Sequence, residues 1–182
     1  MAKAIRRVLS VIAAGALTVS PAAAQQVTKP EVAGIHNLAR LETTVACAGA
    51  TTAESVPEIR KMGFRSIFNL RLASEPGADI PAEEAAARRE GLNYVHVPFT
   101  PTSPDVASVD KFLDAIRDPA NVPAFIHCSG GNRAAGFWLI KRVLVDRWDV
   151  DRAVAEAETL GLDPKGEMKG FALEYIKSHS RP

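Results

Sequence analysis

Short apolar segments alternate with amphipathic segments along most of this chain, and this alternation limits the possible folds more than any other feature. The expected strands are 45–48, 64–70, 92–99 and 122–127, and the expected helices are 51–61, 81–90, 105–117, 134–148, 150–160 and 167–179. Parallel neighbouring strands need a crossover of about a dozen residues or more, which a helix supplies. The pattern predicts an α/β fold of three layers, with helices on both faces of a mostly parallel central sheet.

The composition is that of one ordinary globular domain. The chain has 182 residues, of which 47% are hydrophobic and 24% are charged, so a disordered chain or a polytopic membrane protein is excluded. A net charge of +1 lacks the concentrated excess of basic residues that nucleic-acid binding needs. The two cysteines are too few for a disulfide scaffold or a four-thiolate zinc site, and no ligand spacing predicts a metal or cofactor.

The N-terminus has the pattern of a cleavable signal peptide over residues 1–24. Lys3, Arg6 and Arg7 precede an apolar run over 8–19, and small residues stand before the expected cleavage site. The run is shorter than the roughly 20 residues of a membrane-spanning helix. An uncleaved anchor or a disordered tail is the alternative. We expect a mature protein that is periplasmic or secreted, and free of the membrane after cleavage.

The mature chain begins with a segment that has no clear periodicity. Residues 25–43 contain turn-forming Pro30, Gly34 and Asn37, and we interpret them as a lead-in segment. The alternating strands and helices follow in residues 44–182, which we expect to form the functional domain.

One segment contains residues that are typical of a reactive, anion-binding loop. A continuous apolar strand over 122–127 is followed, in order, by Cys128, Ser129, Gly130, Gly131, Asn132 and Arg133. In open parallel sheets, ligands bind outside the carboxyl ends of the strands. Backbone amides that converge at the start of the next helix would bind a tetrahedral anion and favour a thiolate. We therefore predict that Cys128 is a nucleophile, that Arg133 clamps the anion and that residues 129–132 form the cradle.

A plainer interpretation of the same residues is structural. Free cysteines are often buried and inert, and two glycines can simply make the turn into a helix. Packing alone, however, gives no reason for an arginine at this point. The combination of His127, Cys128, Gly131 and Arg133 at a strand-to-helix junction therefore favours a functional loop.

This loop resembles the phosphate-binding loop of the cysteine-dependent protein tyrosine and dual-specificity phosphatases. It is most similar to the beta-lactamase-hydrolase-like phosphatase family, whose loop reads His-Cys, two residues, then Gly-Asn-Arg. Residues 63–71 and 91–98 resemble the successive strands of that family, and the resemblance covers about 33–162. It implies that 44–182 form a phosphatase-like catalytic domain, which hydrolyses phosphate monoesters through a phosphocysteine intermediate. Its substrate would be a phosphorylated protein or a small phosphate ester.

The sequence departs from the wider phosphatase pattern at three points. Four residues separate Cys128 from Arg133, where the superfamily usually has five, and this shorter loop also resembles that of rhodanese-like sulfurtransferases. Ala134 stands where a hydroxyl residue commonly follows the arginine. The expected general acid is missing after Phe99, and the nearest acid is Asp105, which could instead cap a helix. The alternatives are a sulfurtransferase that carries a persulfide on Cys128, and an anion-binding module without catalysis.

Three further residues have two interpretations each. Arg71 ends a strand and either contacts the same anion or anchors its own loop. His127 precedes the nucleophile. The family resemblance implies that His127 tunes this cysteine indirectly; the other interpretation is a core histidine with its hydrogen bonds satisfied. Cys47 either forms a reversible disulfide with Cys128 or fills space in the core.

Overall fold

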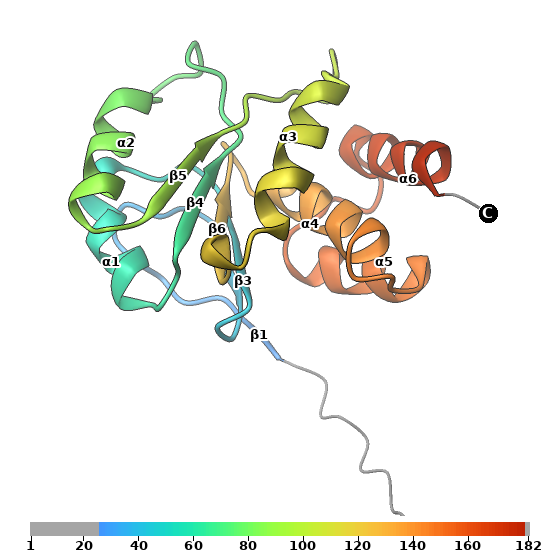
Figure 1. Ribbon diagram of the computed structural model, residues 1–182, viewed down its shortest axis with the longest axis horizontal. Helices are drawn as coiled ribbons and strands as arrows, with labels where there is room; N and C mark the ends of the chain where they lie inside the picture. The colour runs from blue at the N-terminus through green and yellow to red at the C-terminus, as the bar shows by residue number, and fades with distance from the viewer. Residues whose placement is uncertain (1–25, 181–182) are drawn as a thin grey trace, which may run out of the picture.

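A six-stranded sheet forms the centre of the protein in the computed structural model, which describes residues 26–180 (Figure 1). The strands are β1 (Val27–Thr28), β2 (Ala39–Leu41), β3 (Val45–Ala48), β4 (Ser66–Asn69), β5 (Asn93–His96) and β6 (Ala124–His127). Their order is β1-β2-β3-β6-β4-β5; β3, β6, β4 and β5 are parallel, and β1 and β2 pair antiparallel at one edge. The predicted α/β class with a mostly parallel sheet is confirmed.

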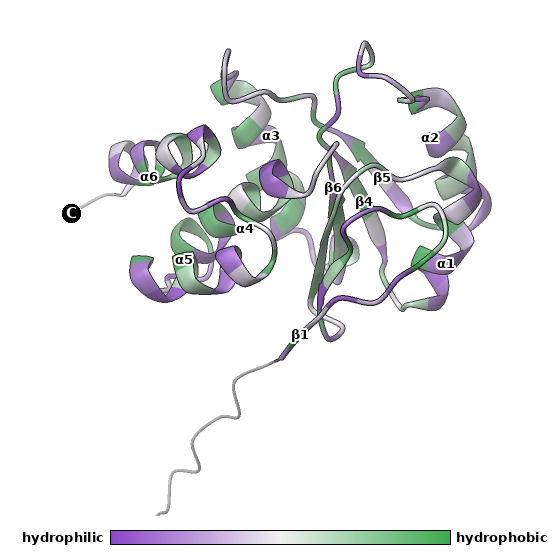
Figure 2. Cartoon of the chain, turned by 180° about the vertical axis from the view of Figure 1, so that it is seen from behind, coloured by the Kyte–Doolittle hydropathy of each residue, from purple (hydrophilic) through white to green (hydrophobic). Residues whose placement is uncertain are grey.

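Helices cover both faces of the sheet, as the alternating pattern predicts. The helices are α1 (Val56–Lys61), α2 (Ile80–Arg89), α3 (Val106–Arg117), α4 (Asn132–Leu144), α5 (Val150–Thr159) and α6 (Glu167–His179), with short 3₁₀ helices η1 (Ala53–Ser55) and η2 (Pro119–Asn121). The helices α1 and α2 lie on one side of the sheet and the other four lie on the opposite side (Figure 1). Figure 2 shows the central strands mostly in the hydrophobic colour, between helices that each have a polar side.

The larger of the two hydrophobic cores lies between the sheet and the helices α3 to α6. Phe137 on α4 is fully buried, and its ring packs edge to face against Phe99 at 4.9 Å and Phe112 at 5.1 Å between centroids. Phe112 packs in turn against Phe68 of β4 at 5.2 Å. Aromatic pairs at such distances and angles add to the stabilisation from burial. This cluster fixes α4 against the sheet and thereby fixes the loop that precedes α4.

Helix α2 shows how local sequence sets the element boundaries. Asp79 caps its first turn, because Oδ1 accepts the Ala82 amide at 3.0 Å, and Pro81 stands where no amide donor is needed. The chain leaves the helix through Gly91, whose φ of +68° lies in the left-handed region that glycine adopts most easily.

The structure differs from the sequence prediction in the segment 25–43. This segment was expected to be an irregular lead-in, but it contributes β1 and β2 to the sheet. Ala39 and Leu41 of β2 are buried, and they pair with Cys47 and Val45 of β3. A strand of three residues is too short to show a period of two, so the sequence pattern did not reveal it.

Helix α4 is also displaced from the predicted span of 134–148. It begins two residues earlier, because Gly131 provides the N-cap and the next residue already has helical geometry. It ends at Leu144, and Arg147 beyond it adopts a left-handed φ of +61°. Arg133 therefore lies in the first turn of α4 rather than in the loop.

Two parts of the chain bear on membrane association: the predicted signal peptide and the described helices. The expected signal peptide, residues 1–24, lies outside the described residues. Between residues 26 and 180, none of the helices has the length and apolarity that crossing a bilayer requires.

We expect Phe137→Ala to lower the free energy of unfolding by about 3–5 kcal/mol, because it leaves a cavity beside the rings of Phe99 and Phe112. Urea denaturation followed by circular dichroism measures this change. The exposed Val106, whose side chain is 44% accessible, supplies the control. Val106→Ala should stay within about 0.5 kcal/mol of the wild type. A loss below about 1 kcal/mol for Phe137→Ala would show that the core closes around the missing ring.

Candidate active site

The loop from Cys128 to Gly131 lies at the carboxyl end of β6, beside the end of β3. The Cys128 amide donates to the Ala48 carbonyl at 3.1 Å, and the Ala50 amide donates to the Ser129 carbonyl at 2.9 Å. The first bond extends the parallel pairing of β3 and β6, and the second lies beside an isolated antiparallel bridge between Gly49 and Gly130. The loop is therefore held at the edge of the sheet where ligands of open parallel sheets bind.

Cys128 lies at the base of this loop, with only 1% of its surface exposed. The Gly131 amide donates to its Sγ at 3.1 Å, and Gly131 is the N-cap residue of α4. The φ of Gly131 is +102°, which a residue with a side chain rarely adopts. An amide and the positive end of a helix dipole thus both face the sulfur.

The guanidinium of Arg133 is directed inward, toward the loop. Its Nη2 donates to Ser129 Oγ at 3.0 Å, and its Nη1 donates to the carbonyls of Leu70 at 3.0 Å and Phe99 at 2.7 Å. Burial works against its positive charge, but hydrogen bonds from the group to Glu75 and the nearby Cys128 sulfur outweigh burial and raise the pKa of Arg133. The structure therefore brings the predicted nucleophile and the predicted clamp together.

Glu75 is a site residue that the sequence analysis missed. Its two carboxylate oxygens accept from Arg133 Nη1 at 2.6 Å and Nη2 at 2.8 Å. Burial works against ionisation of Glu75, but the hydrogen bonds from Arg133 and from the Leu72 amide outweigh it and lower the pKa of the carboxyl. The available signal was an acid four residues after Arg71, in the loop that follows a buried strand.

Arg71 anchors this loop, which was one of its two predicted roles. It is 4% exposed, and its guanidinium donates to the carbonyls of Pro76 at 2.5 Å and Gly77 at 3.2 Å. Its Nε lies 3.4 Å from Glu75 Oε2. The side chain is thus engaged within its own loop and directed to Glu75.

Asp105 caps a helix, which was the alternative to a role as proton donor. Its Oδ1 accepts the Ala107 amide at 3.0 Å, and its Oδ2 accepts the Ser108 hydroxyl at 2.9 Å. Both oxygens are therefore bound at the start of α3, as an N-cap residue requires.

The remaining cradle residues are braced by segments from elsewhere in the chain. The Gly130 carbonyl accepts from Asn37 Nδ2 at 3.1 Å, and Asn132 Oδ1 accepts the Asp163 amide at 2.9 Å. The loop is thus fixed from both sides, by the segment before β2 and by the segment between α5 and α6.

His127 lies on the opposite face of β6 from Cys128 and belongs to a second polar cluster. It is fully buried, and its Nε2 lies 2.8 Å from Glu83 Oε1, in a close contact rather than a well-aligned hydrogen bond. Glu83 Oε2 accepts from Asn69 Nδ2 at 2.8 Å and from the Tyr94 hydroxyl at 3.3 Å. Burial and the charge of Glu83 raise the pKa of Tyr94. His127 is thus a buried histidine with a carboxylate partner.

Cys47 is a fully buried free thiol on β3, and Cys128 is also free. Burial raises the pKa of Cys47, and the charges of Cys128 and Glu156 add to this effect. Cys47 therefore fills space as a neutral thiol in this structure. A reversible bridge between the two cysteines stays a prediction.

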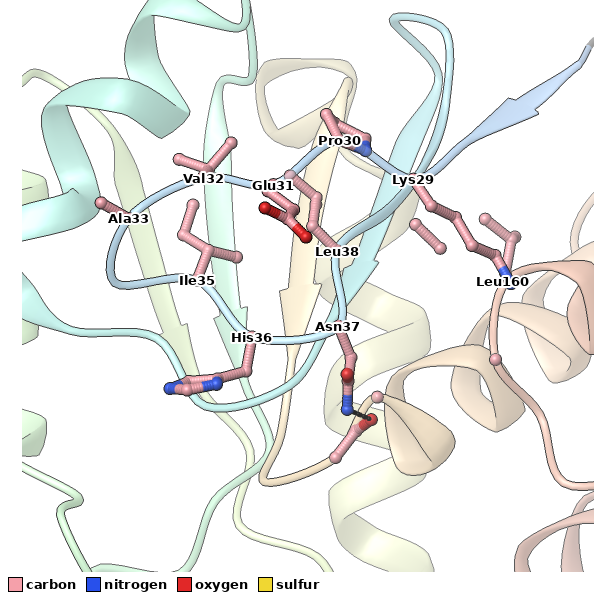
Figure 3. Close-up of a pocket in the computed structure, with 14 residues that line it drawn as sticks. Lys29, Pro30, Glu31, Val32, Ala33, Ile35, His36, Asn37, Leu38 and Leu160 are labelled. Atoms are coloured by element: carbon pink, nitrogen blue, oxygen red, sulfur yellow. Dashed lines mark hydrogen bonds between the residues drawn. The ribbon is translucent and has the colours of Figure 1, made fainter.

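A groove of about 750 Å³ lies next to the loop (Figure 3). Its walls are formed by the segment 29–39, by Gly130 and Gly131, and by Leu160 and Gly161 at the end of α5. The segment interpreted as a lead-in thus lines the surface beside the site. Within residues 26–180, no group of three or more His, Cys, Asp and Glu side chains is arranged to hold a metal ion.

A cysteine beneath a glycine-rich turn, with an arginine in the first turn of the following helix, defines the phosphatase-like class of α/β domains. Residues 37–145 match the family described as the phosphatase-like domain of beta-lactamase hydrolase-like proteins, and the chain belongs to this family. The resemblance seen in the sequence is confirmed.

Known relatives and solved structures agree with this assignment. A beta-lactamase hydrolase-like protein of Xylella fastidiosa (strain Temecula1) is 34% identical over 137 residues, which are 73% of this chain and 30% of the relative. The chain thus spans less than a third of this relative's length. A candidate phosphatase from Shewanella putrefaciens has a TM-score of 0.67 at 18% identity, covering 82% of this chain and 94% of the other. TpbA of P. aeruginosa has a TM-score of 0.62 at 20% identity, covering 87% and 92%. These two structures share the fold.

We expect Glu83→Ala to lower the free energy of unfolding by about 3–5 kcal/mol, because it leaves His127 and Asn69 buried without their carboxylate partner. Chemical denaturation measures the loss. Glu84 is the neighbouring residue on α2 and pairs with Arg88 at the surface, so Glu84→Ala should change stability by less than about 1 kcal/mol. Equal effects of the two substitutions would mean that the buried contact is energetically neutral.

Proposed function

We propose that this chain is a cysteine-dependent phosphatase, which hydrolyses phosphate monoesters through a phosphocysteine intermediate. The observation that carries the proposal is the position of Cys128 Sγ, which receives the Gly131 amide at 3.1 Å at the start of α4, beside the inward guanidinium of Arg133. The expected signal peptide supports action in the periplasm or outside the cell.

The reaction would proceed in two displacements at phosphorus. The Cys128 thiolate attacks, the sulfur–phosphorus bond forms, and the bond to the ester oxygen breaks, so that the alcohol leaves as an oxyanion that takes a proton from water. A water molecule then attacks phosphorus, inorganic phosphate leaves, and the thiolate is restored. Arg133 and the amides of residues 129–133 would hold the phosphoryl oxygens as their charge develops.

We further propose that aryl phosphates, including phosphotyrosine, are better substrates than alkyl phosphates. Both oxygens of Asp105 are bound in its helix cap, so a side-chain proton donor is not provided there. A phenolate leaves without protonation more readily than an alkoxide, because its conjugate acid titrates near 10. TpbA, which shares the fold, has also been solved in complex with phosphotyrosine.

Sulfur transfer is the second candidate function, and the same observation at Asp105 favours it. In that reaction the Cys128 thiolate takes the outer sulfur of a donor such as thiosulfate, and sulfite leaves. The persulfide then passes this sulfur to an acceptor such as cyanide, and the thiolate is restored. Neither step needs a general acid, and the four-residue spacing between Cys128 and Arg133 suits a single sulfur atom.

Turnover of p-nitrophenyl phosphate by the purified, reduced protein tests the primary proposal. We expect turnover that vanadate inhibits and that Cys128→Ser abolishes, since an alcohol at this position is a far weaker nucleophile than a thiolate. Thiocyanate formation from thiosulfate and cyanide, without phosphate ester turnover, would instead establish sulfur transfer. Phosphate binding without either reaction would leave a non-catalytic anion-binding module.

Asp105→Asn should leave kcat for p-nitrophenyl phosphate within about twofold of the wild type, because asparagine caps helices as well as aspartate does. Loss of a true general acid would cost about 10²- to 10⁴-fold. The measurement is steady-state kinetics, with phenyl phosphate as a second substrate whose leaving group is poorer. Asp105→Ala should lower stability by about 0.5–2 kcal/mol through loss of the cap. A kcat that is a hundredfold lower in Asp105→Asn would show instead that Asp105 acts as the proton donor.

A further inference from the structure

We propose that the groove lined by the segment 29–39 is a second binding site, which holds the peptide chain beside a phosphorylated residue while the phosphate lies over Cys128. This inference rests on the proposed phosphatase function and adds a docking site to it. The groove has a volume of about 750 Å³, which is within the usual range of ligand-binding clefts. Such a cleft has room for a few residues of extended peptide.

A single peptide unit separates this groove from the sulfur of Cys128. The amide of that unit, which belongs to Gly131, donates to Cys128 Sγ at 3.1 Å. Its carbonyl, which belongs to Gly130, accepts from Asn37 Nδ2 at 3.1 Å, and Asn37 lines the groove (Figure 3). The sulfur is therefore less than about 9 Å from Asn37 Nδ2, a distance that three residues of extended chain span. One peptide can thus reach both places.

The wall between the cradle and the groove is low at Gly130. A Cβ added to Gly130 would meet no heavy atom within 4 Å, so open space lies beside this residue. Its φ is outside the left-handed region, in contrast to that of Gly131. Neither crowding nor backbone conformation therefore requires glycine at this position. Because Gly130 has no side chain, a ligand can cross from the cradle to the groove over the backbone alone.

The lining of the groove suits a peptide better than a second anionic group. Among its described lining residues, Lys29 and Glu31 are the only Lys, Arg, Asp or Glu, and both extend from the same wall (Figure 3). Strong binding of additional phosphates needs several cations, and one lysine beside one glutamate does not supply them. An apolar side chain of a peptide would instead be buried against the apolar lining, which includes Pro30, Val32, Ile35, Leu38 and Leu160.

Backbone hydrogen bonds hold the wall of the groove in place before any ligand binds. The Gly49 amide donates to the His36 carbonyl at 2.7 Å, and the His36 amide donates to the Ala50 carbonyl at 3.0 Å. The Thr52 amide donates to the Gly34 carbonyl at 2.9 Å. The segment is thus fixed to the chain that follows β3, which also holds the loop of Cys128. A preformed groove binds a peptide without the cost of ordering its own walls.

Two substrates that share the phosphate and differ in the attached chain test this docking site. One is a phosphotyrosine peptide with apolar neighbours, and the other is p-nitrophenyl phosphate, which has no chain to place in the groove. Glu31 is exposed and lines the groove, so Glu31→Trp fills part of it without disturbing the core. We expect Glu31→Trp to lower kcat/KM for the peptide by about tenfold or more, on the scale of one buried apolar side chain, and to leave that for p-nitrophenyl phosphate within about twofold.

The control is Glu84→Trp, which places the same indole on the exposed surface of α2 and should change neither value. An unchanged kcat/KM for the peptide in folded Glu31→Trp would overturn the proposal, and so would an equal fall for both substrates. Ala33→Trp, at a second exposed position in the groove, carries the same expectations if Glu31→Trp does not fold.

Binding to the Cys128→Ser variant separates this docking site from the proposed reaction. We expect the peptide to bind with a Kd about tenfold or more below that of free phosphotyrosine, and Glu31→Trp in the same background to remove this difference. Equal Kd values, or a difference that Glu31→Trp leaves intact, would overturn docking in the groove. Absence of turnover in the wild type would overturn the proposed function and would leave this comparison of Kd values as it is.

Discussion

The site depends on keeping a guanidinium buried beside a sulfur. Arg133 is 8% exposed, and a charge removed from water to that degree costs several kcal/mol unless hydrogen bonds compensate it. The compensation comes from acceptors that lie far apart in the chain. They are the carbonyls of Leu70 and Phe99, which follow β4 and β5, the carboxylate of Glu75 and the hydroxyl of Ser129. The segments after β4, β5 and β6 must therefore meet at one point, and the parallel order of these strands brings their carboxyl ends together.

Side chains on the two faces of the sheet at the end of β6 have different structural roles. His127 and Cys128 are adjacent, so their side chains project to opposite sides of the sheet. His127 belongs to the α2 side with Glu83 and Asn69, whereas Cys128 belongs to the side where α4 begins. A shift of this strand by one residue would turn His127 away from Glu83 and leave buried polar groups without partners, so the cluster disfavours any other register. The buried polar cluster of His127, Glu83 and Asn69 thus helps to fix the position along β6 at which Cys128 leaves the sheet.

The sequence predicted those features of the fold and site that depend on local pattern. The strand Val45–Ala48 and the helix Glu167–His179 have the predicted bounds, and the residues from Cys128 to Gly131 form the predicted loop between a strand and a helix. Contacts between segments that are far apart in the chain leave no such local pattern in the sequence. Glu75 lies 58 residues before Arg133, and an acid in a loop looks the same whether it faces solvent or an arginine. For Asp105 the residue type allowed two roles, and the bonds to the Ala107 amide and the Ser108 hydroxyl show the capping role.

The same geometry explains why two reactions suit this site. Arg133 and the amide at Gly131 are arranged to hold negative charge, whereas Asp105, the acid nearest in sequence to the expected proton donor, is engaged in its helix cap. Such a site accelerates a displacement most when the departing group is already a stable anion, because general acid catalysis contributes about 10²- to 10⁴-fold only where a proton must be delivered. A phenolate leaving phosphorus and a sulfite leaving sulfur both meet this condition. On the proposed function, the nature of the leaving group, rather than the identity of the attacked atom, would be the property that this loop selects.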